Sequence, residues 1–211
     1  MNILLIDHDD SFIYNIKAWL QTTPCQLTII NYHQIPTDFN FLEFDGIILS
    51  PGPKSPNDYP RSLELLKTST QPIFGICLGF QMMITIHNGN IHPYSPVFHG
   101  KTSALMLEDK KINIPTFDPL KNFLETNMQV ARYHSLGLKK EEIKSFSPLQ
   151  DLIFAYTPDE MAMIFYDSKN QRLSFQFHPE SFLTEHSTIW AEVVNNWFQS
   201  CKKKKDGEIH V

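Results

Sequence analysis

The hydrophobic residues of this chain fall into short runs separated by stretches with helical spacing. Residues 3–6, 27–30 and 44–49 are runs of strand length, and the last ends in an unbroken Ile-Ile-Leu that is typical of a strand covered on both faces. Residues 12–20 carry apolar side chains at helical spacing, and 60–67 begins with a proline that suits a first helical turn. Alternating strands and helices indicate a parallel sheet, so the pattern predicts an α/β fold.

The pattern changes in the second half of the chain. Residues 87–107 hold short alternating stretches broken by glycine and proline, which predicts strands and turns. Three strand-like runs follow at 152–156, 161–166 and 172–177, and a helix with one apolar face is expected at 186–199. We therefore predict an open, mostly parallel sheet flanked by helices, with a small additional antiparallel β element.

A cysteine stands where a predicted strand gives way to a predicted helix. The apolar run 73–76 stops at Cys77, and residues 78–87 have apolar positions at helical spacing. Gly75 and Gly79 flank the cysteine and permit a tight turn. A strand, a sharp turn that carries the nucleophile, and a helix are the parts of a nucleophile elbow. The partial positive charge of the helix N-terminus favours a thiolate there. A buried structural cysteine is the alternative, since free cysteines are usually buried.

A histidine and a carboxylate follow about a hundred residues later. Residues 173–178 alternate between apolar and polar types and predict a strand that ends at Pro179. His178 and Glu180 are two positions apart, which in extended chain places both side chains on one side. A carboxylate beside an imidazole fixes its tautomer and supports the imidazolium, so the histidine can act as base and then acid. We predict Cys77, His178 and Glu180 as nucleophile, base and orienting group, although the His-Pro-Glu segment alone is also typical of a solvated turn.

Composition narrows the class of protein. The chain has 211 residues, 42% of them hydrophobic, and a formal net charge of −5. We predict one domain over residues 1–200 and a basic polar tail over 201–211. No apolar run is long enough for a membrane span, no secretory signal is evident, and the acidic balance argues against nucleic acid. Cys25, Cys77 and Cys201 form no disulfide or zinc pattern, so we expect a cytoplasmic protein without a metal site.

Two motifs together resemble a known family. Gly-Ile-Cys-Leu-Gly-Phe-Gln at 75–81 and Phe-Gln-Phe-His-Pro-Glu-Ser at 175–181 look like the class I (triad) glutamine amidotransferases. The start of the chain, Ile-Leu-Leu-Ile-Asp-His-Asp-Asp-Ser-Phe-Ile-Tyr-Asn at 3–15, resembles the amidotransferase subunits (component II) of anthranilate synthase and aminodeoxychorismate synthase. Further matches are Ser-Pro-Gly-Pro at 50–53, His-Gly-Lys at 99–101 and Ala-Arg-Tyr-His-Ser-Leu at 131–136.

The resemblance implies a flavodoxin-like fold and assigns roles to further residues. It implies an oxyanion hole made by the backbone N–H groups of Gly52 and Leu78. The same resemblance implies that glutamine is bound by Gly52, Gln81, Ser135 and Leu136.

The resemblance also implies the reaction and the partner. L-glutamine would be hydrolysed through a cysteine thioester, and ammonia would pass to a chorismate-using synthase subunit (component I). The product would be anthranilate, for tryptophan, or aminodeoxychorismate, for folate. No cofactor is expected on this chain, and Mg²⁺ is expected on the partner. A stand-alone γ-glutamyl hydrolase and a non-catalytic interaction subunit of the same fold are the alternatives.

Three departures from the family pattern involve four positions. Lys54 stands where the Pro-Gly-Pro loop usually continues with glycine, and it carries strain if that position requires a positive φ. Phe80 replaces a common histidine after the second elbow glycine. His8 and Asp9 replace the usual Asn-Tyr, and none of the three departures removes a predicted catalytic residue.

Overall fold

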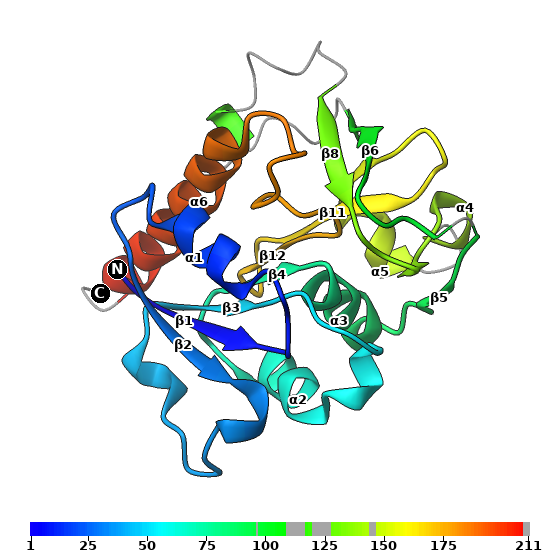
Figure 1. Cartoon of the computed structure of the whole chain (residues 1–211). Coiled ribbons are helices and arrows are strands. Elements are labelled where there is room, and N and C mark those ends of the chain that lie inside the picture. Colours follow the sequence, from blue (N-terminus) through cyan, green and yellow to red (C-terminus); the bar gives the residue numbers. More distant parts are fainter. Residues whose placement is uncertain (96, 109–116, 120–127, 144–146, 209–211) are drawn as a thin grey trace.

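An eight-stranded sheet forms the centre of the molecule in the computed structural model of the protein (Figure 1). The structure describes residues 1–95, 97–108, 117–119, 128–143 and 147–208. The strand order is β2-β1-β3-β4-β12-β11-β10-β7. The first five strands in this order, from β2 to β12, run parallel, and β11, β10 and β7 each pair antiparallel with the strand before. The predicted fold class, an open and mostly parallel sheet, is therefore confirmed.

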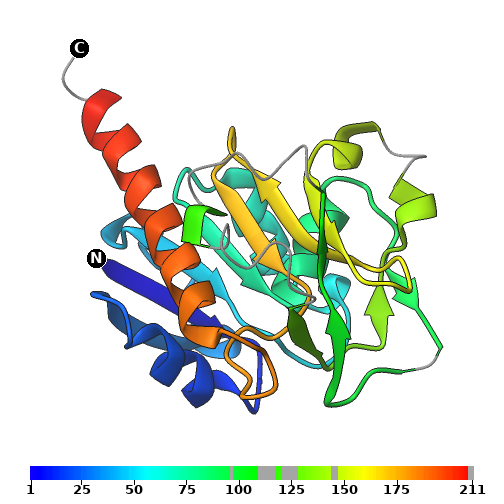
Figure 2. The same cartoon turned by 90° about the horizontal axis from the view of Figure 1, so that it is seen from above.

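The strands of this sheet are β1 (Asn2–Asp7), β2 (Gln26–Asn31), β3 (Gly46–Leu49), β4 (Ile73–Ile76), β7 (Met106–Leu107), β10 (Ile153–Tyr156), β11 (Ala162–Asp167) and β12 (Arg172–Phe175). Two small antiparallel sheets pair β5 (His92–Pro93) with β9 (Leu136–Gly137), and β6 (Lys101–Ala104) with β8 (Gln129–Arg132). They are the predicted additional β element. Both views place them at the end of the molecule opposite α6 (Figures 1 and 2).

Helices cover both faces of the large sheet, as the unbroken apolar strands require. Leu4 and Ile6 of β1 point to one face, where they join the apolar side chains of two helices, α2 (Pro60–Thr68) and α3 (Leu78–Ile86). Ile3 and Leu5 point to the other face, covered by α1 (Ile13–Leu20) and α6 (Ser187–Glu208). The other described elements are two short helices, α4 (Lys140–Ile143) and α5 (Ser147–Gln150), and 3₁₀ turns at Tyr32–Gln34, Phe41–Glu43, Pro56–Asp58 and 117–119.

The last helix is longer than its apolar pattern predicts. The pattern gives an end at residue 199, but α6 continues to Glu208, because straight-chain residues such as lysine are good helix formers. Cys201 is only 5% exposed, and Lys202 forms an ion pair with Asp45 at 3.0 Å. The first residues of the predicted polar tail thus continue a helix that is anchored to the sheet, while the predicted domain division at residue 200 stays a prediction.

Candidate active site

The carboxyl ends of four neighbouring parallel strands carry the predicted catalytic residues to one edge of the sheet. β1, β3, β4 and β12 are neighbours, so the segments that follow them emerge side by side. These segments contain His8, the loop 50–54, Cys77 and His178. Ligands of open α/β sheets bind beyond the carboxyl ends of the strands, which makes this edge the candidate active site.

Cys77 adopts a backbone conformation that side chains rarely take. It lies between β4 and α3 with φ 50° and ψ −91°, and its side chain is nearly buried. The turn is compact because glycine stands on both sides. A Cβ on Gly75 would lie 2.6 Å from the carbonyl carbon of Gly79, and a Cβ on Gly79 would lie 2.7 Å from the carbonyl oxygen of Leu49. The strained backbone holds the sulfur at the N-terminus of α3, beside the partial positive charge of the helix dipole.

We expect a Gly79→Ala substitution to lower the free energy of unfolding by about 1–3 kcal/mol, because its Cβ would overlap rigid backbone of β3. Urea or thermal unfolding measures this loss. Gly137→Ala is the matched control, since its Cβ would meet only the flexible end of Met161, which can move aside. Equal stability of the two variants would contradict the close helix–strand approach described here.

His178 and Glu180 form a buried pair. The Nδ1 atom of His178 lies 2.7 Å from Oε1 of Glu180, and both side chains are almost fully shielded from solvent. Burial by itself would lower the pKa of His178, but the charge of Glu180 and the nearby sulfur of Cys77 raise it well above its ordinary value. The Nε2 atom has no hydrogen-bond partner of good geometry among the described residues. The structure therefore brings the three predicted catalytic residues together, with the imidazole poised as an imidazolium beside the sulfur.

Two aromatic rings hold the imidazole in place. Tyr133 and Phe12 pack edge-on against His178, with ring centroids 4.9 and 5.7 Å away. The hydroxyl of Tyr133 lies 3.2 Å from Oγ of Ser181, which fixes the tyrosine ring in turn. This packing restricts rotation of the imidazole about the Cα–Cβ and Cβ–Cγ bonds of His178.

A chain of amide groups connects the sulfur to the predicted glutamine-binding segment. Gln81 donates from Nε2 to the carbonyl of Leu136 at 3.2 Å and to Oε1 of Gln176 at 3.4 Å. Gln176 in turn donates to the sulfur of Cys77 at 3.6 Å. Sequence reasoning missed Gln176, a buried polar residue that directly follows β12. Of the predicted glutamine-binding residues, Gln81 and Leu136 are thus linked to the sulfur through Gln176, and Ser135, which precedes Leu136, is exposed.

Buried polar groups support the predicted glutamine-binding segment at Ser135 and Leu136. The guanidinium of Arg132 is inaccessible to solvent, binds Asp159 through two hydrogen bonds at 2.8 and 3.0 Å, and donates from Nε to Nε2 of His134 at 3.1 Å. His134 must then carry its proton on Nδ1, which lies 2.9 Å from the carbonyl of Leu136. Burial, with the charge of Arg132, lowers the pKa of His134 to about 3, so the ring is neutral. His134 therefore supports the backbone at Leu136 as a structural residue.

The two predicted oxyanion donors are neighbours. A Cβ on Gly52 would lie 2.9 Å from Cδ2 of Leu78 and 2.5 Å from the carbonyl oxygen of His8, so only glycine fits this position. Lys54, in the same loop, has φ 68°. The position therefore does require the conformation that glycine prefers, and lysine adds strain of about 1 kcal/mol or more there. Phe80 is fully buried in the core beside α2 and is not exposed to the site.

Residues that could hold a metal do not gather in the part of the chain that the structure describes. No group of three or more histidine, cysteine, aspartate or glutamate side chains is arranged there for an ion. Within the same residues, no helix has the length and apolar character needed to cross a membrane. No disulfide joins Cys25, Cys77 and Cys201.

Comparison with known proteins decides the family. The model of the family "Glutamine amidotransferase class-I" matches residues 4–197. The chain belongs to the class-I glutamine amidotransferases. It is 33% identical over 203 residues to "Anthranilate synthase component 2, pyocyanine specific" of Pseudomonas aeruginosa, which covers 93% of this chain and 94% of the relative. It is also 33% identical over 205 residues to "Aminodeoxychorismate/anthranilate synthase component 2" of Bacillus subtilis, and the match covers 96% of this chain and 98% of that relative.

Solved structures agree with this amidotransferase fold. A putative GMP synthase protein from Thermoplasma acidophilum superposes with a TM-score of 0.76 at 16% identity, covering 100% of this chain and 98% of the other. The likeness at such low identity shows the fold alone. Family membership makes the chain a glutamine amidotransferase, and the roles of its individual residues rest on the geometry described above.

Proposed function

We propose that this amidotransferase is the glutamine-hydrolysing subunit of a chorismate-using synthase and delivers ammonia for anthranilate or aminodeoxychorismate formation. The observation that carries the proposal is the assembly of Cys77, His178 and Glu180 at one strand edge, within a chain similar along nearly all its length to component 2 of such synthases. Cysteines that form no disulfide fit a reducing compartment, and we propose the cytoplasm.

The first half of the reaction breaks the side-chain amide of glutamine. The thiolate of Cys77 attacks the amide carbon and forms a tetrahedral oxyanion, which the N–H groups of Gly52 and Leu78 stabilise. His178, as imidazolium, gives its proton to the leaving nitrogen. The C–N bond breaks, ammonia departs, and the γ-glutamyl group remains as a thioester on the sulfur.

The second half regenerates the enzyme. Neutral His178 takes a proton from water as the water oxygen attacks the thioester. The C–S bond then breaks, glutamate leaves, and Cys77 returns as a thiolate beside the imidazolium. Glu180 supports the imidazolium in both halves because it accepts the Nδ1 hydrogen bond throughout.

The ammonia is used on another chain. We place the chorismate site, with its Mg²⁺, on a larger synthase subunit, and ammonia passes to it through a path shielded from water.

The decisive experiment supplies candidate partners one at a time. The purified chain is mixed with chorismate, Mg²⁺, glutamine and either an anthranilate synthase component 1 or an aminodeoxychorismate synthase component 1. Product with one partner assigns the pathway, and product with both identifies a shared subunit. Product from added ammonium salt without this chain is the control for the partner's own activity.

Two results would overturn the proposal. Full glutamine hydrolysis without either partner, and no product with them, favours a stand-alone γ-glutamyl hydrolase. No turnover under any condition, combined with an unreactive Cys77, favours a non-catalytic subunit of the same fold.

A further inference from the structure

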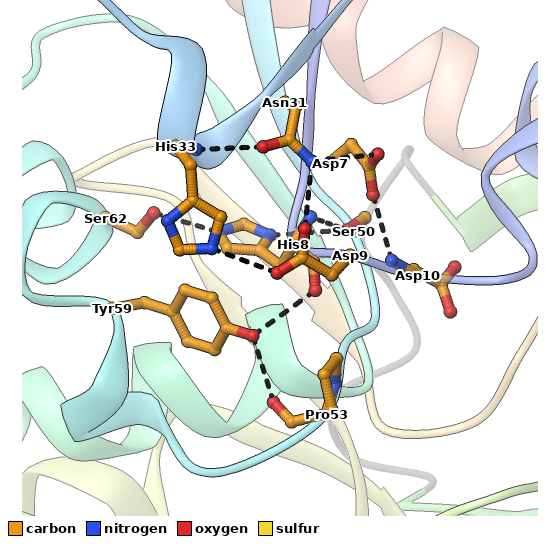
Figure 3. A network of polar contacts seen from close by, with 10 residues as sticks. All are labelled: Asp7, His8, Asp9, Asp10, Asn31, His33, Ser50, Pro53, Tyr59 and Ser62. Atoms are coloured by element: carbon orange, nitrogen blue, oxygen red, sulfur yellow. Dashed lines mark hydrogen bonds and ion pairs between the residues drawn. The ribbon is translucent and has the colours of Figure 1, made fainter.

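A buried histidine contacts the predicted oxyanion loop from behind. His8 follows β1, is inaccessible to solvent, and lies between the loop residue Ser50 and Ser62 of α2 (Figure 3). Its Nδ1 lies 3.3 Å from Oγ of Ser50 and its Nε2 lies 2.9 Å from Oγ of Ser62. The rings of Tyr32 and Tyr59 pack on it, with centroids 5.6 and 4.9 Å away. His8 takes no part in the steps proposed for glutamine hydrolysis.

The direction of each hydrogen bond in this cluster can be deduced. The hydroxyl of Ser50 donates its proton to the carbonyl of Pro51, so its oxygen accepts from the N–H and from Nδ1–H of His8. Burial lowers the pKa of His8 to about 3, so the ring is neutral and carries only one proton. With that proton on Nδ1, Nε2 accepts from the hydroxyl of Ser62. The chain therefore runs in one direction, from Ser62 through His8 and Ser50 to the carbonyl of Pro51.

That carbonyl belongs to the same peptide group as the predicted oxyanion donor. The peptide between Pro51 and Gly52 is planar, so its N–H points opposite to its C=O. An anchored Pro51 carbonyl therefore aims the Gly52 N–H. Among the described residues no protein group accepts this N–H, so it is available to a ligand.

A second contact holds the far side of the same loop. The hydroxyl of Tyr59 donates to the carbonyls of Pro53, at 3.2 Å, and His8, at 3.3 Å, and so links the two segments (Figure 3). The carbonyl of His8 is also the atom that a Cβ on Gly52 would meet. The loop is thus fixed before and after Gly52 and packs directly on the backbone of His8.

We propose that His8 is a positioning residue, which, with Ser62 and Tyr59, orients the Ser50 hydroxyl and thereby aims the Gly52 N–H at the tetrahedral oxyanion. The inference rests on the proposed function, because the Gly52 N–H stabilises an oxyanion only if the protein hydrolyses glutamine. It also accounts for His8 where the family usually has asparagine, because the imidazole reaches two hydroxyls on opposite sides at once.

The test uses variants that keep the packing and remove one hydroxyl. Ser62→Ala removes the donor to Nε2 of His8, and Tyr59→Phe removes the contact to Pro53. We expect each to lower kcat for glutamine hydrolysis about 10- to 100-fold, less than the loss of a whole oxyanion donor, with KM within about twofold. Tyr32→Phe is the control, since its ring also packs on His8 but, among the described residues, its hydroxyl accepts only from the Arg61 N–H.

A second readout separates this role from general damage to the fold. Iodoacetamide alkylates the sulfur of Cys77 without forming an oxyanion, so its rate should be the same in Ser62→Ala, Tyr59→Phe and the unmodified chain. Assays use the complex with whichever synthase subunit supports turnover. A wild-type kcat in both Ser62→Ala and Tyr59→Phe would overturn the inference, as would slow alkylation together with a raised KM. If the unmodified complex itself has no glutaminase activity, it is the proposed function that fails.

Discussion

Replacement of Cys77 by alanine should abolish glutamine hydrolysis, with a loss of at least about 10⁴-fold in kcat. No other described side chain at this edge offers a nucleophile in the strained turn between β4 and α3. The fold should survive, because alanine removes only the sulfur from a site that retains its two glycines. Ammonia release from glutamine, measured with the synthase partner present, gives the loss directly. Synthesis from added ammonium salt should continue in the same complex, since that route bypasses the thioester.

Cys25→Ser provides the control for the loss of a thiol. Cys25 is partly exposed and contacts Thr23 and the carbonyl of Leu20, far along the chain from the elbow. We expect this variant to hydrolyse glutamine at the normal rate. Hydrolysis by Cys77→Ala at more than a few per cent of the normal rate would rule out the thioester mechanism.

Replacement of Glu180 by glutamine should lower kcat by about 10²- to 10⁴-fold, while the shape of the site is kept. The carboxylate is the main group that raises the pKa of His178 against the effect of burial. Without it the imidazolium is less stable, so the pKa of His178 falls. Loss of the imidazolium ends activity at high pH, and the alkaline limb of the rate profile should therefore move to lower pH. Glu185→Gln is the matched control, because Glu185 is an exposed carboxylate that, in the described part of the chain, accepts only from the Gln129 N–H.

The raised pKa of His178 also predicts how the stability of the fold depends on pH. Because the folded-state pKa of His178 is raised, its imidazolium stabilises the fold below the ordinary histidine pKa of about 6.5. That contribution is lost as pH rises through the folded-state value. The unmodified chain should therefore exceed Glu180→Gln in unfolding free energy more at mildly acidic than at alkaline pH. An imidazole NMR titration that is identical in both proteins would contradict the pairing.

The elements that sequence predicts well are those with a strong local signal. The strands β1, β2 and β3 follow from apolar runs, and α3 follows from helical spacing after the Gly-x-Cys-x-Gly turn. The elbow itself was predictable because few residues other than glycine permit a strand and helix to approach so closely. The pair His178 and Glu180 was predictable because two residues two apart in an extended chain share a side.

What sequence misses depends on contacts between distant segments. Gln176, Arg132 and His8 are polar residues whose burial and partners come from other strands and helices, so no local pattern marks them. The start of α1 has no clear local signal either. The cap position is Phe12, which makes no side-chain capping hydrogen bond. Asp10, two residues earlier, uses its N–H to bind the side chain of Asp7 in the loop after β1.

The place of β12 beside β4 has a consequence for how the enzyme is made. Cys77 and Gln176 touch although they lie 99 positions apart, so the reactive centre closes only when nearly all the chain is available. During synthesis, the nucleophile leaves the ribosome long before its base, and an incomplete chain cannot release ammonia. Until β12 arrives, β4 is an unpaired edge, and such edges attract other strands. Chains cut short before residue 172 should therefore aggregate rather than form a weak glutaminase.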